Sequence, residues 1–281
     1  MKKLDNVTVS SDSEDNSNIF KLSANSLFNF MKQYEYLEYA IEHMAFQPRY
    51  YPENIEYLNL VQQDVALLEW YIPMSCFCDI PLHQIAVHTE AYGKFGIGLT
   101  KDFGIRNGIQ PIQYLNNKSV QVQELSKLMN DLLGSANDEL ENNPAADYII
   151  DYLTYVKPIT GKMKRSATSD DEIKKNFHDE HEWRYVPILE TGELPSMLVD
   201  KDEIMAEKTS NIYSNSITKS KKGMLNFNVD DIRYIFVDNI TNRDRLIRYI
   251  RSKKSGKRIS KNDKDVLISK IIVYSELAED W

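Results

Sequence analysis

Two glutamates and an arginine alternate in the segment FHDEHEWRYVP, which spans residues 177–187. On a β-strand, Glu180, Glu182 and Arg184 would lie on one face, because successive side chains point to opposite sides. A carboxylate held in a cleft could accept a hydrogen bond from a sugar hydroxyl and stabilise an oxocarbenium-like transition state, as in glycosyl transfer. The alternative is an ion pair of Glu182 or Glu180 with Arg184 at a sheet edge, since charges that leave water need partners.

A second segment, residues 73–104, combines two histidines with a glycine-rich bend. His88 and Tyr92 are four residues apart on an expected helix and would meet on one face, whereas His83 and His88 are five apart and make a poor metal pair. Each histidine could equally be a packed or surface side chain. Five of the ten glycines fall within residues 93–108. Their spacing does not match a dinucleotide fingerprint, and they precede a strand instead of opening a helix, which excludes a Rossmann domain.

Arg49 lies in the loop FQPRYYPE, between two expected helices. An arginine in a proline-bounded aromatic loop could bind a phosphate, and the alternative is a surface arginine stacked on a tyrosine. A metal-dependent nuclease would need an acidic cluster. Asp79 and Asp102 are available for one, but nothing in the spacing singles them out, so we expect no metal site.

The charge of the chain is divided unevenly. The 281 residues carry a net charge of -8, yet residues 217–264 hold 14 Lys or Arg against 5 Asp or Glu, a net +9, which leaves -17 for the rest. The densest basic stretch is 251–264. It is either a solvated loop or a contact for phosphates or an acidic partner. No aromatic residue interleaves its lysines, so base stacking is not indicated.

Composition narrows the class of protein. A hydrophobic fraction of 42% supports a sizeable core. The two cysteines, Cys76 and Cys78, exclude a disulfide framework and almost exclude a cysteine-based zinc site. No apolar run approaches the roughly 20 residues that span a bilayer, and residues 1–18 lack the apolar core of a secretory signal. We therefore expect a cytoplasmic protein that does not contact membranes.

The periodicity of apolar residues and the turn signals predict one α+β domain over residues 21–281, after a disordered tail at residues 1–20. The expected helices are 26–44, 52–68, 81–91, 119–134, 142–156 and 241–253, the last capped by Thr241 or Asn242, with a helical turn over 101–108. The expected strands are 69–78, 95–101, 109–114 and 181–189, with two short strands within 223–239. A mobile polar loop is expected over 160–172, and a closing strand or helix–strand unit over 267–277.

Several of these segments together resemble one known family. They are FQPRYYPE, IPMSCFCDIPL, H-x-x-x-YGKFGIGLTKDFG, G-x-x-P-x-x-Y and F-x-x-EHEWRYVP, and they are densest at residues 72–114 and 177–187. The set resembles the AbiGi family of abortive-infection phage-resistance proteins, described as the antitoxin partner of a two-gene system. This resemblance runs from about Ser26 to the C-terminus. It implies a role in antiviral defence within a toxin–antitoxin pair, and a toxin as partner protein.

A wider likeness exists to ADP-ribosyltransferases, an NAD-dependent class of glycosyltransferase. It implies a mixed or antiparallel sheet core with N-terminal and inserted helices. Residue by residue, Glu182 would match the catalytic glutamate and Glu180 its companion. Arg49 or His88 would contact the dinucleotide, with Tyr92 nearby. The sequence departs from one transferase class because Ser75-Cys76-Phe77-Cys78 stands where that class has Ser-Thr-Ser.

Three hypotheses follow. In the first, the protein is a phage-defence protein of AbiGi type with a transferase-like site, in which Glu182 stabilises the cationic sugar and Arg184 or Arg49 holds phosphate. In the second, it is a non-catalytic antitoxin, and the basic segment 217–264 binds an acidic toxin surface or the operon's DNA. The third, a nuclease, has the least support because no metal-ligand cluster is visible.

Overall fold

A computed structural model describes the chain over residues 24–62, 64–134, 144–164, 172–189, 194–195, 197–198, 203–220, 222–252 and 259–280. The predicted disordered tail at residues 1–20 lies outside these ranges, as do residues 165–171 of the predicted polar loop and residues 253–258 of the basic stretch.

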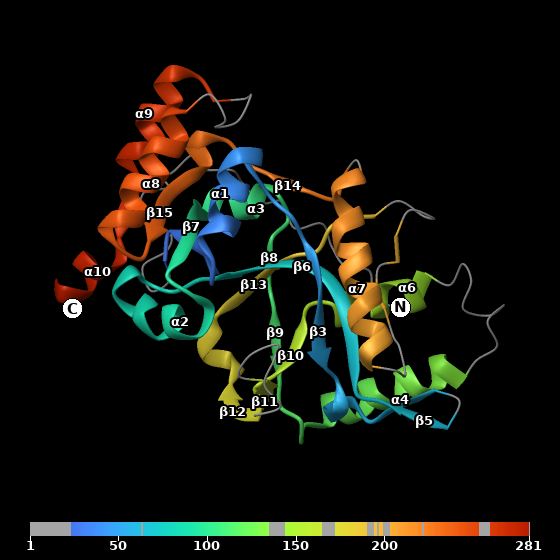
Figure 1. Ribbon diagram of the computed structural model, residues 1–281. Coiled ribbons are helices and arrows are strands. Elements are labelled where there is room, and N and C mark those ends of the chain that lie inside the picture. Colours follow the sequence, from blue (N-terminus) through green and yellow to red (C-terminus); the bar gives the residue numbers. More distant parts are fainter. Residues whose placement is uncertain are drawn as a thin grey trace, which may run out of the picture.

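An eight-stranded mixed sheet forms the centre of the protein, with the strand order β16-β15-β7-β1-β6-β13-β8 and with β3 paired to β6 (Figure 1). All of its pairings are antiparallel except β15 with β16. The fold is therefore α+β, as the sequence predicts. Its strands are β1 (Ser26–Met31), β3 (Arg49–Asn54), β6 (Glu69–Cys78), β7 (Phe95–Thr100), β8 (Gln110–Pro111), β13 (Glu182–Tyr185), β15 (Ile232–Val237) and β16 (Ile271–Val273).

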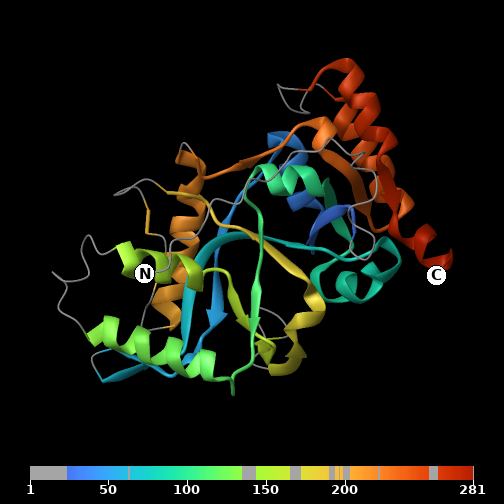
Figure 2. The same cartoon turned by 180° about the vertical axis from the view of Figure 1, so that it is seen from behind.

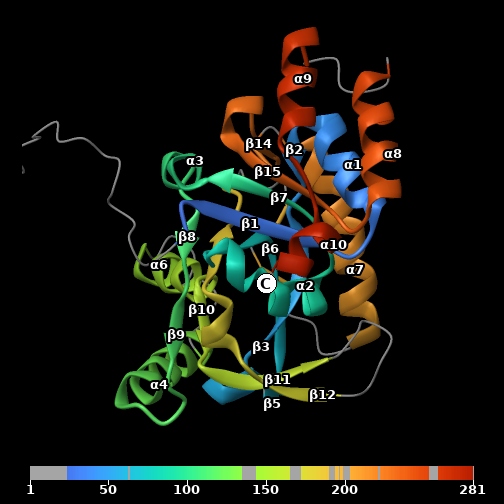
Figure 3. The same ribbon diagram turned by 90° about the vertical axis from the view of Figure 1, so that its left-hand side faces the viewer.

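Helices cover both faces of the sheet around β1, β7 and β15 (Figure 3). Side chains alternate along β1, so Leu27 and Met31 pack into one core while Phe28 packs into another. The first core is closed by α1 (Tyr34–His43), α3 (Lys101–Arg106), α8 (Ile240–Arg251) and α9 (Lys261–Ser269). The second is closed by α2 (Ile85–Tyr92) and α10 (Tyr274–Leu277).

A third core lies at the other end of the molecule, away from α8 and α9, around Trp70 and Ile72 of β6 (Figures 1 and 2). The long strand β6 thus joins the two halves. The elements of this half are β4 (Leu60–Gln62), β5 (Val65–Leu67), β9 (Gln113–Leu115), α4 (Val120–Gly134), α6 (Pro144–Leu153), β10 (Val156–Pro158), β11 (Thr160–Lys164) and β12 (Glu172–Asn176). On β3, Tyr50 packs against α7 (Glu203–Ser216), and a short pair joins β2 (Ala45–Phe46) to β14 (Leu225–Asn226).

The two N-terminal helices predicted from periodicity are wrong in part. Residues 26–31 form β1, and only 34–43 are helical. The apolar positions of this segment suit either element, and pairing with β7 along six residues decides for the strand. The helix predicted from Pro52 does not form. Pro52 lies within β3 opposite Tyr71 of β6, and the strands β4 and β5 follow.

Most later predictions are confirmed, with shifted ends. The strand over 69–78 is β6, and the helices over 119–134 and 142–156 are α4 and α6. The strand predicted over 181–189 is shorter, because β13 ends at Tyr185 and a 3-10 helix (Phe177–Glu180) precedes it. Helix α8 is capped by Asn239, not by Thr241 or Asn242. The predicted loop 160–172 contains β11, and helix α7 was not predicted.

The glycines of the bend make room for neighbouring groups. A Cβ on Gly98 would lie 2.8 Å from the Phe28 ring, and a Cβ on Gly96 would lie 2.8 Å from the carbonyl oxygen of Asn29. Gly93 has φ of +106°, where a Cβ would overlap the Met31 carbonyl. The bend is therefore packed tightly against β1. Among the residues described, no helix is both long enough and apolar enough to cross a bilayer.

Candidate functional site

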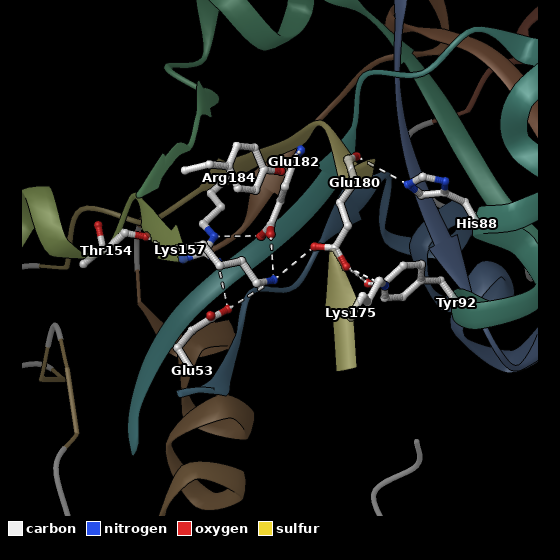
Figure 4. A network of polar contacts seen from close by, with 10 residues as sticks. Glu53, His88, Tyr92, Thr154, Lys157, Lys175, Glu180, Glu182 and Arg184 are labelled. Carbon is white, nitrogen blue, oxygen red and sulfur yellow. Dashed lines mark hydrogen bonds and ion pairs between the residues drawn. The ribbon is translucent and has the colours of Figure 1, made fainter. Parts of the chain in front are cut away.

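Glu180 and Glu182 are brought together by an unusual backbone conformation at the residue between them. Glu180 ends the 3-10 helix and Glu182 begins β13, and His181 links them with φ of +44° and ψ of +48°. A non-glycine residue seldom adopts this left-handed conformation, which costs about 1 kcal/mol or more. The turn directs both carboxylates to the same side, where Lys157 contacts both of them (Figure 4).

Glu182 lies between two cations in Figure 4. Its Oε1 accepts from Arg184 Nε at 2.7 Å, and its Oε2 accepts from Lys157 Nζ at 3.0 Å. The Arg184 guanidinium also donates to Glu53 Oε1 at 2.8 Å and to the Thr154 carbonyl at 2.8 Å. One arginine on β13 is thus connected to β3 and to the turn before β10.

Glu180 forms the other half of the arrangement. Its Oε2 accepts from Lys157 Nζ at 3.1 Å, and its Oε1 accepts from Lys175 Nζ at 2.6 Å and from the Tyr92 hydroxyl. Lys175 also donates to the Tyr92 hydroxyl at 2.6 Å. His88 Nε2 lies 3.4 Å from the backbone carbonyl of Glu180. Helix α2 and strand β12 therefore meet at this carboxylate.

We call Glu53, Lys157, Lys175, Glu180, Glu182 and Arg184 the acid–base cluster. Its three carboxylates face three cations, so its formal charges cancel. All six side chains are at most 19% exposed, and Arg184 is fully buried. Charges taken out of water are tolerated only when they are paired in this way.

The pKa values of these groups reflect the pairing. Burial alone would raise the pKa of Glu182, but Arg184 and Lys157 outweigh burial and hold it well below its usual range. The pKa of Glu180 is also lowered, because Lys157 and Lys175 outweigh the effect of burial. For Lys157, burial is outweighed by Glu182, Glu53 and Glu180, which raise its pKa. Glu180, Glu182 and Lys157 are therefore charged at neutral pH.

Five of the six predicted site residues come together here: Glu180, Glu182, Arg184, His88 and Tyr92. Arg49 does not join them. Its guanidinium donates to Asn211 Oδ1 on α7 at 3.0 Å. The ion pair between Glu182 and Arg184, one of the two interpretations of the sequence, is present.

The other residues considered as site residues from the sequence do not belong to the acid–base cluster. Asp79 forms an ion pair of 2.6 Å with buried Lys101, and Cys76 and Cys78 are free thiols. Burial raises the pKa of the Cys76 thiol, so it is protonated at neutral pH. Within the described part of the chain, no group of three or more His, Cys, Asp or Glu side chains could hold a metal ion.

The sequence did not single out Glu53, Lys157 or Lys175. Lys157 lies on β10 between the buried residues Val156 and Pro158. A charged residue in so apolar a setting is a weak signal for a buried partner. No local pattern connects it to Glu182, 25 residues further along the chain, and pairing over such a distance depends on the fold.

Comparison with known proteins gives two matches. The family model described as "Putative abortive phage resistance protein AbiGi, antitoxin" matches residues 44–238. An abortive phage resistance protein AbiGi from Lactococcus lactis subsp. cremoris is 52% identical over 250 residues, which is 85% of this chain and 100% of the relative. The chain belongs to the AbiGi family. No solved structure matches it. The likeness to ADP-ribosyltransferases thus rests on sequence motifs alone and stays a prediction.

In this AbiGi protein, the family match includes the whole acid–base cluster and ends at residue 238, just before α8. The cluster thus belongs to the part of the chain that the family model covers. Helix α8, with four arginines and one aspartate, and helix α9 lie beyond that part.

Proposed function

We propose that this AbiGi protein is the antitoxin of a phage-defence toxin–antitoxin pair, and that it neutralises its toxin by binding it. The description of the family as an antitoxin and the full-length match to an AbiGi relative support the role. The acid–base cluster supports neutralisation by binding, because it acts as a framework that holds β3, β10, β12 and β13 in one arrangement.

One observation favours binding over catalysis. Both oxygens of Glu180 and both oxygens of Glu182 already accept from lysine, arginine or tyrosine donors. A glutamate that stabilises a cationic sugar must direct an oxygen at the substrate. Glu182 would first have to release Lys157 or Arg184, which would leave a buried charge without its partner at a cost of about 3–5 kcal/mol.

A second candidate is an NAD-dependent ADP-ribosyl transfer in which Glu182 is the catalytic carboxylate and Glu180 its companion. The observation that favours it is the convergence of Glu180, Glu182, His88 and Tyr92. Arg184 would then hold a phosphate, after exchanging one of its carboxylate partners. Arg49 would serve as a dinucleotide contact only if the bound molecule extended to α7.

One experiment tests the binding proposal. The chain and the product of the neighbouring gene are expressed together, with the chain tagged. Binding predicts that the two proteins co-purify in a fixed ratio and that growth inhibition by the toxin is relieved only when the chain is present at comparable amounts. Relief by a small fraction of that amount would indicate catalysis and contradict the proposal.

Incubation with labelled NAD separates the two candidates. The wild type, Glu182→Gln and the control Glu90→Gln are each mixed with toxin and cell extract. Glu90 is exposed on α2 and carries the same charge as Glu182, so both variants lose one carboxylate. Binding predicts no transfer of label by any of the three proteins. Transfer by the wild type and by Glu90→Gln, but not by Glu182→Gln, would establish the transferase.

A further inference from the structure

Helices α8 and α9 place a group of cations at one end of the molecule. The two helices lie side by side, at the end opposite β12 and α4 (Figures 1 and 3). The last turn of α8 meets the first turn of α9, as shown by the 3.1 Å hydrogen bond from Lys264 Nζ to the Ser252 carbonyl. Side chains from these two turns therefore share one surface.

Three cations on this surface are open to solvent. Arg248 and Arg251 in the last turn of α8 and Lys261 at the start of α9 are exposed, and among the described residues none of them has an ion-pair partner. Other arginines of α8 are already paired, since Arg245 contacts Glu35 at 3.2 Å and Arg243 contacts Asp244 at 3.0 Å. We call Arg248, Arg251 and Lys261 the basic face.

The acidic group closest in sequence, Asp263, forms no ion pair with the basic face among the described residues. Asp263 Oδ2 accepts from the Ser260 backbone N–H at 3.1 Å, and Asp263 N–H donates to Ser260 Oγ at 3.1 Å. This capping box uses the carboxylate to satisfy the helix terminus. Asp265 is also exposed on α9, four residues after Lys261, and within the described residues no ion pair joins it to the basic face. The three cations are therefore open to solvent and can contact a partner.

The chemistry of the basic face indicates which partner fits. Interfaces between proteins are built around buried apolar or aromatic anchors. In the described part of α8 and α9, the only exposed large apolar side chain is Ile240, at the far end of α8. Cations without an apolar anchor suit the phosphates of a nucleic acid.

The described residues of α8 and α9 include no exposed aromatic residue, and this indicates which kind of nucleic acid fits. Proteins that hold single strands stack bases on aromatic rings, and this surface offers none. We propose that the basic face binds the phosphate backbone of duplex nucleic acid without reading its sequence. The face lies on α8 and α9, apart from the acid–base cluster, and this proposal does not rest on the proposed toxin binding.

The test uses the full chain and a fluorescently labelled DNA duplex of arbitrary sequence, with binding followed by anisotropy. The triple variant Arg248→Gln/Arg251→Gln/Lys261→Gln removes the basic face. The matched control Lys118→Gln/Lys127→Gln/Lys174→Gln removes three exposed lysines from α4 and its neighbourhood and from β12, so both variants have the same net charge. Circular dichroism and thermal unfolding confirm that both variants fold.

We expect the wild type and the control to bind with affinities that fall as salt rises. At about 0.1 M salt the basic-face variant should bind at least about 10-fold more weakly, and the slope of log affinity against log salt should decrease by up to about 2.7, for three lost phosphate contacts. Equal loss in both variants, or no binding by the wild type, would overturn the proposal. So would loss of toxin co-purification by the basic-face variant with unchanged duplex binding, which would assign the face to a protein.

Discussion

The Glu182 carboxylate and the Arg184 guanidinium lie on the same side of β13, two residues apart, and form an ion pair of 2.7 Å. Arg184 is fully buried and also bonds Glu53 of β3, so this pair connects β13 to β3. The pair is part of a network in which the charges cancel, since Lys157 also pairs with Glu182 and Lys175 pairs with Glu180.

A double-mutant cycle at Lys157 and Glu182 tests this balance. Lys157→Met leaves three buried carboxylates with too few cations, and Glu182→Gln leaves a buried cation in excess. Each change should lower the free energy of unfolding by about 3–5 kcal/mol. The double variant should lose less than the sum, by roughly 1–3 kcal/mol, because the two groups interact directly. Additive losses in urea unfolding would show that Lys157 and Glu182 are not coupled.

Acid should destabilise the fold through the same carboxylates. The pKa values of Glu180 and Glu182 are lowered in the folded protein, so below about pH 4.3, the usual value for glutamate, the unfolded chain binds more protons. Their contribution is complete above that pH and is lost as the pH falls toward the folded-state pKa. The free energy of unfolding of Lys157→Met should therefore depend less steeply on pH below 4.3 than that of the wild type. An equally steep dependence would count against the pairing.

His88 should add a second pH dependence at higher pH. Burial lowers its pKa, against the opposing effect of Glu180. Protonation then favours the unfolded chain, and stability should fall as the pH drops below about 6.5 until it reaches the folded-state pKa. His88→Gln keeps a hydrogen-bond donor and should flatten the unfolding free energy in this range. His83→Gln, at an exposed position, should keep the wild-type profile, and a flattened profile there would contradict the assignment.

Two glycines with positive φ should respond differently to alanine. At Gly93 the new Cβ would lie 2.1 Å from the Met31 carbonyl oxygen, whereas at Gly108, with φ of +68°, no atom lies within 4 Å. We expect Gly93→Ala to cost roughly 3 kcal/mol or more, from overlap and backbone strain together. Gly108→Ala should cost about 1–2 kcal/mol, from strain alone. Similar melting temperatures for the two variants would contradict the packing of the bend against β1.

The sequence predicts best those elements whose local pattern permits one structure. Helix α4 and strand β6 are such cases, because their length and composition suit no alternative. Residues 26–31 suit a helix or a strand equally well, and pairing with β7 decides between them. Pro52 is a common first residue of a helix, yet here it lies in β3 beside β6. Such pairings depend on residues far away in the chain.

In the candidate site too, the residues with a local pattern are predicted and those that depend on distant parts of the chain are not. Glu182 and Arg184 are found from the sequence because their spacing places them on one face of β13. The sequence predicts Glu180 on the same strand, but it lies in the preceding 3-10 helix and reaches Glu182 through the left-handed turn at His181. Lys157 and Glu53 are not, since each reaches the acid–base cluster only when β10 and β3 have taken their places in the fold. The pattern suggests a carboxylate held in a cleft or an ion pair at a sheet edge, and the fold adds Glu53, Lys157 and Lys175 to make a buried network whose formal charges cancel.

Direct titration of the purified chain with its toxin in buffer without NAD tests the central proposal, with complex formation followed by calorimetry and native mass spectrometry. We expect a complex of fixed stoichiometry that forms without any covalent change in mass of either protein. Absence of a complex at micromolar concentrations, together with an increase in toxin mass by one ADP-ribose when NAD is added, would contradict it.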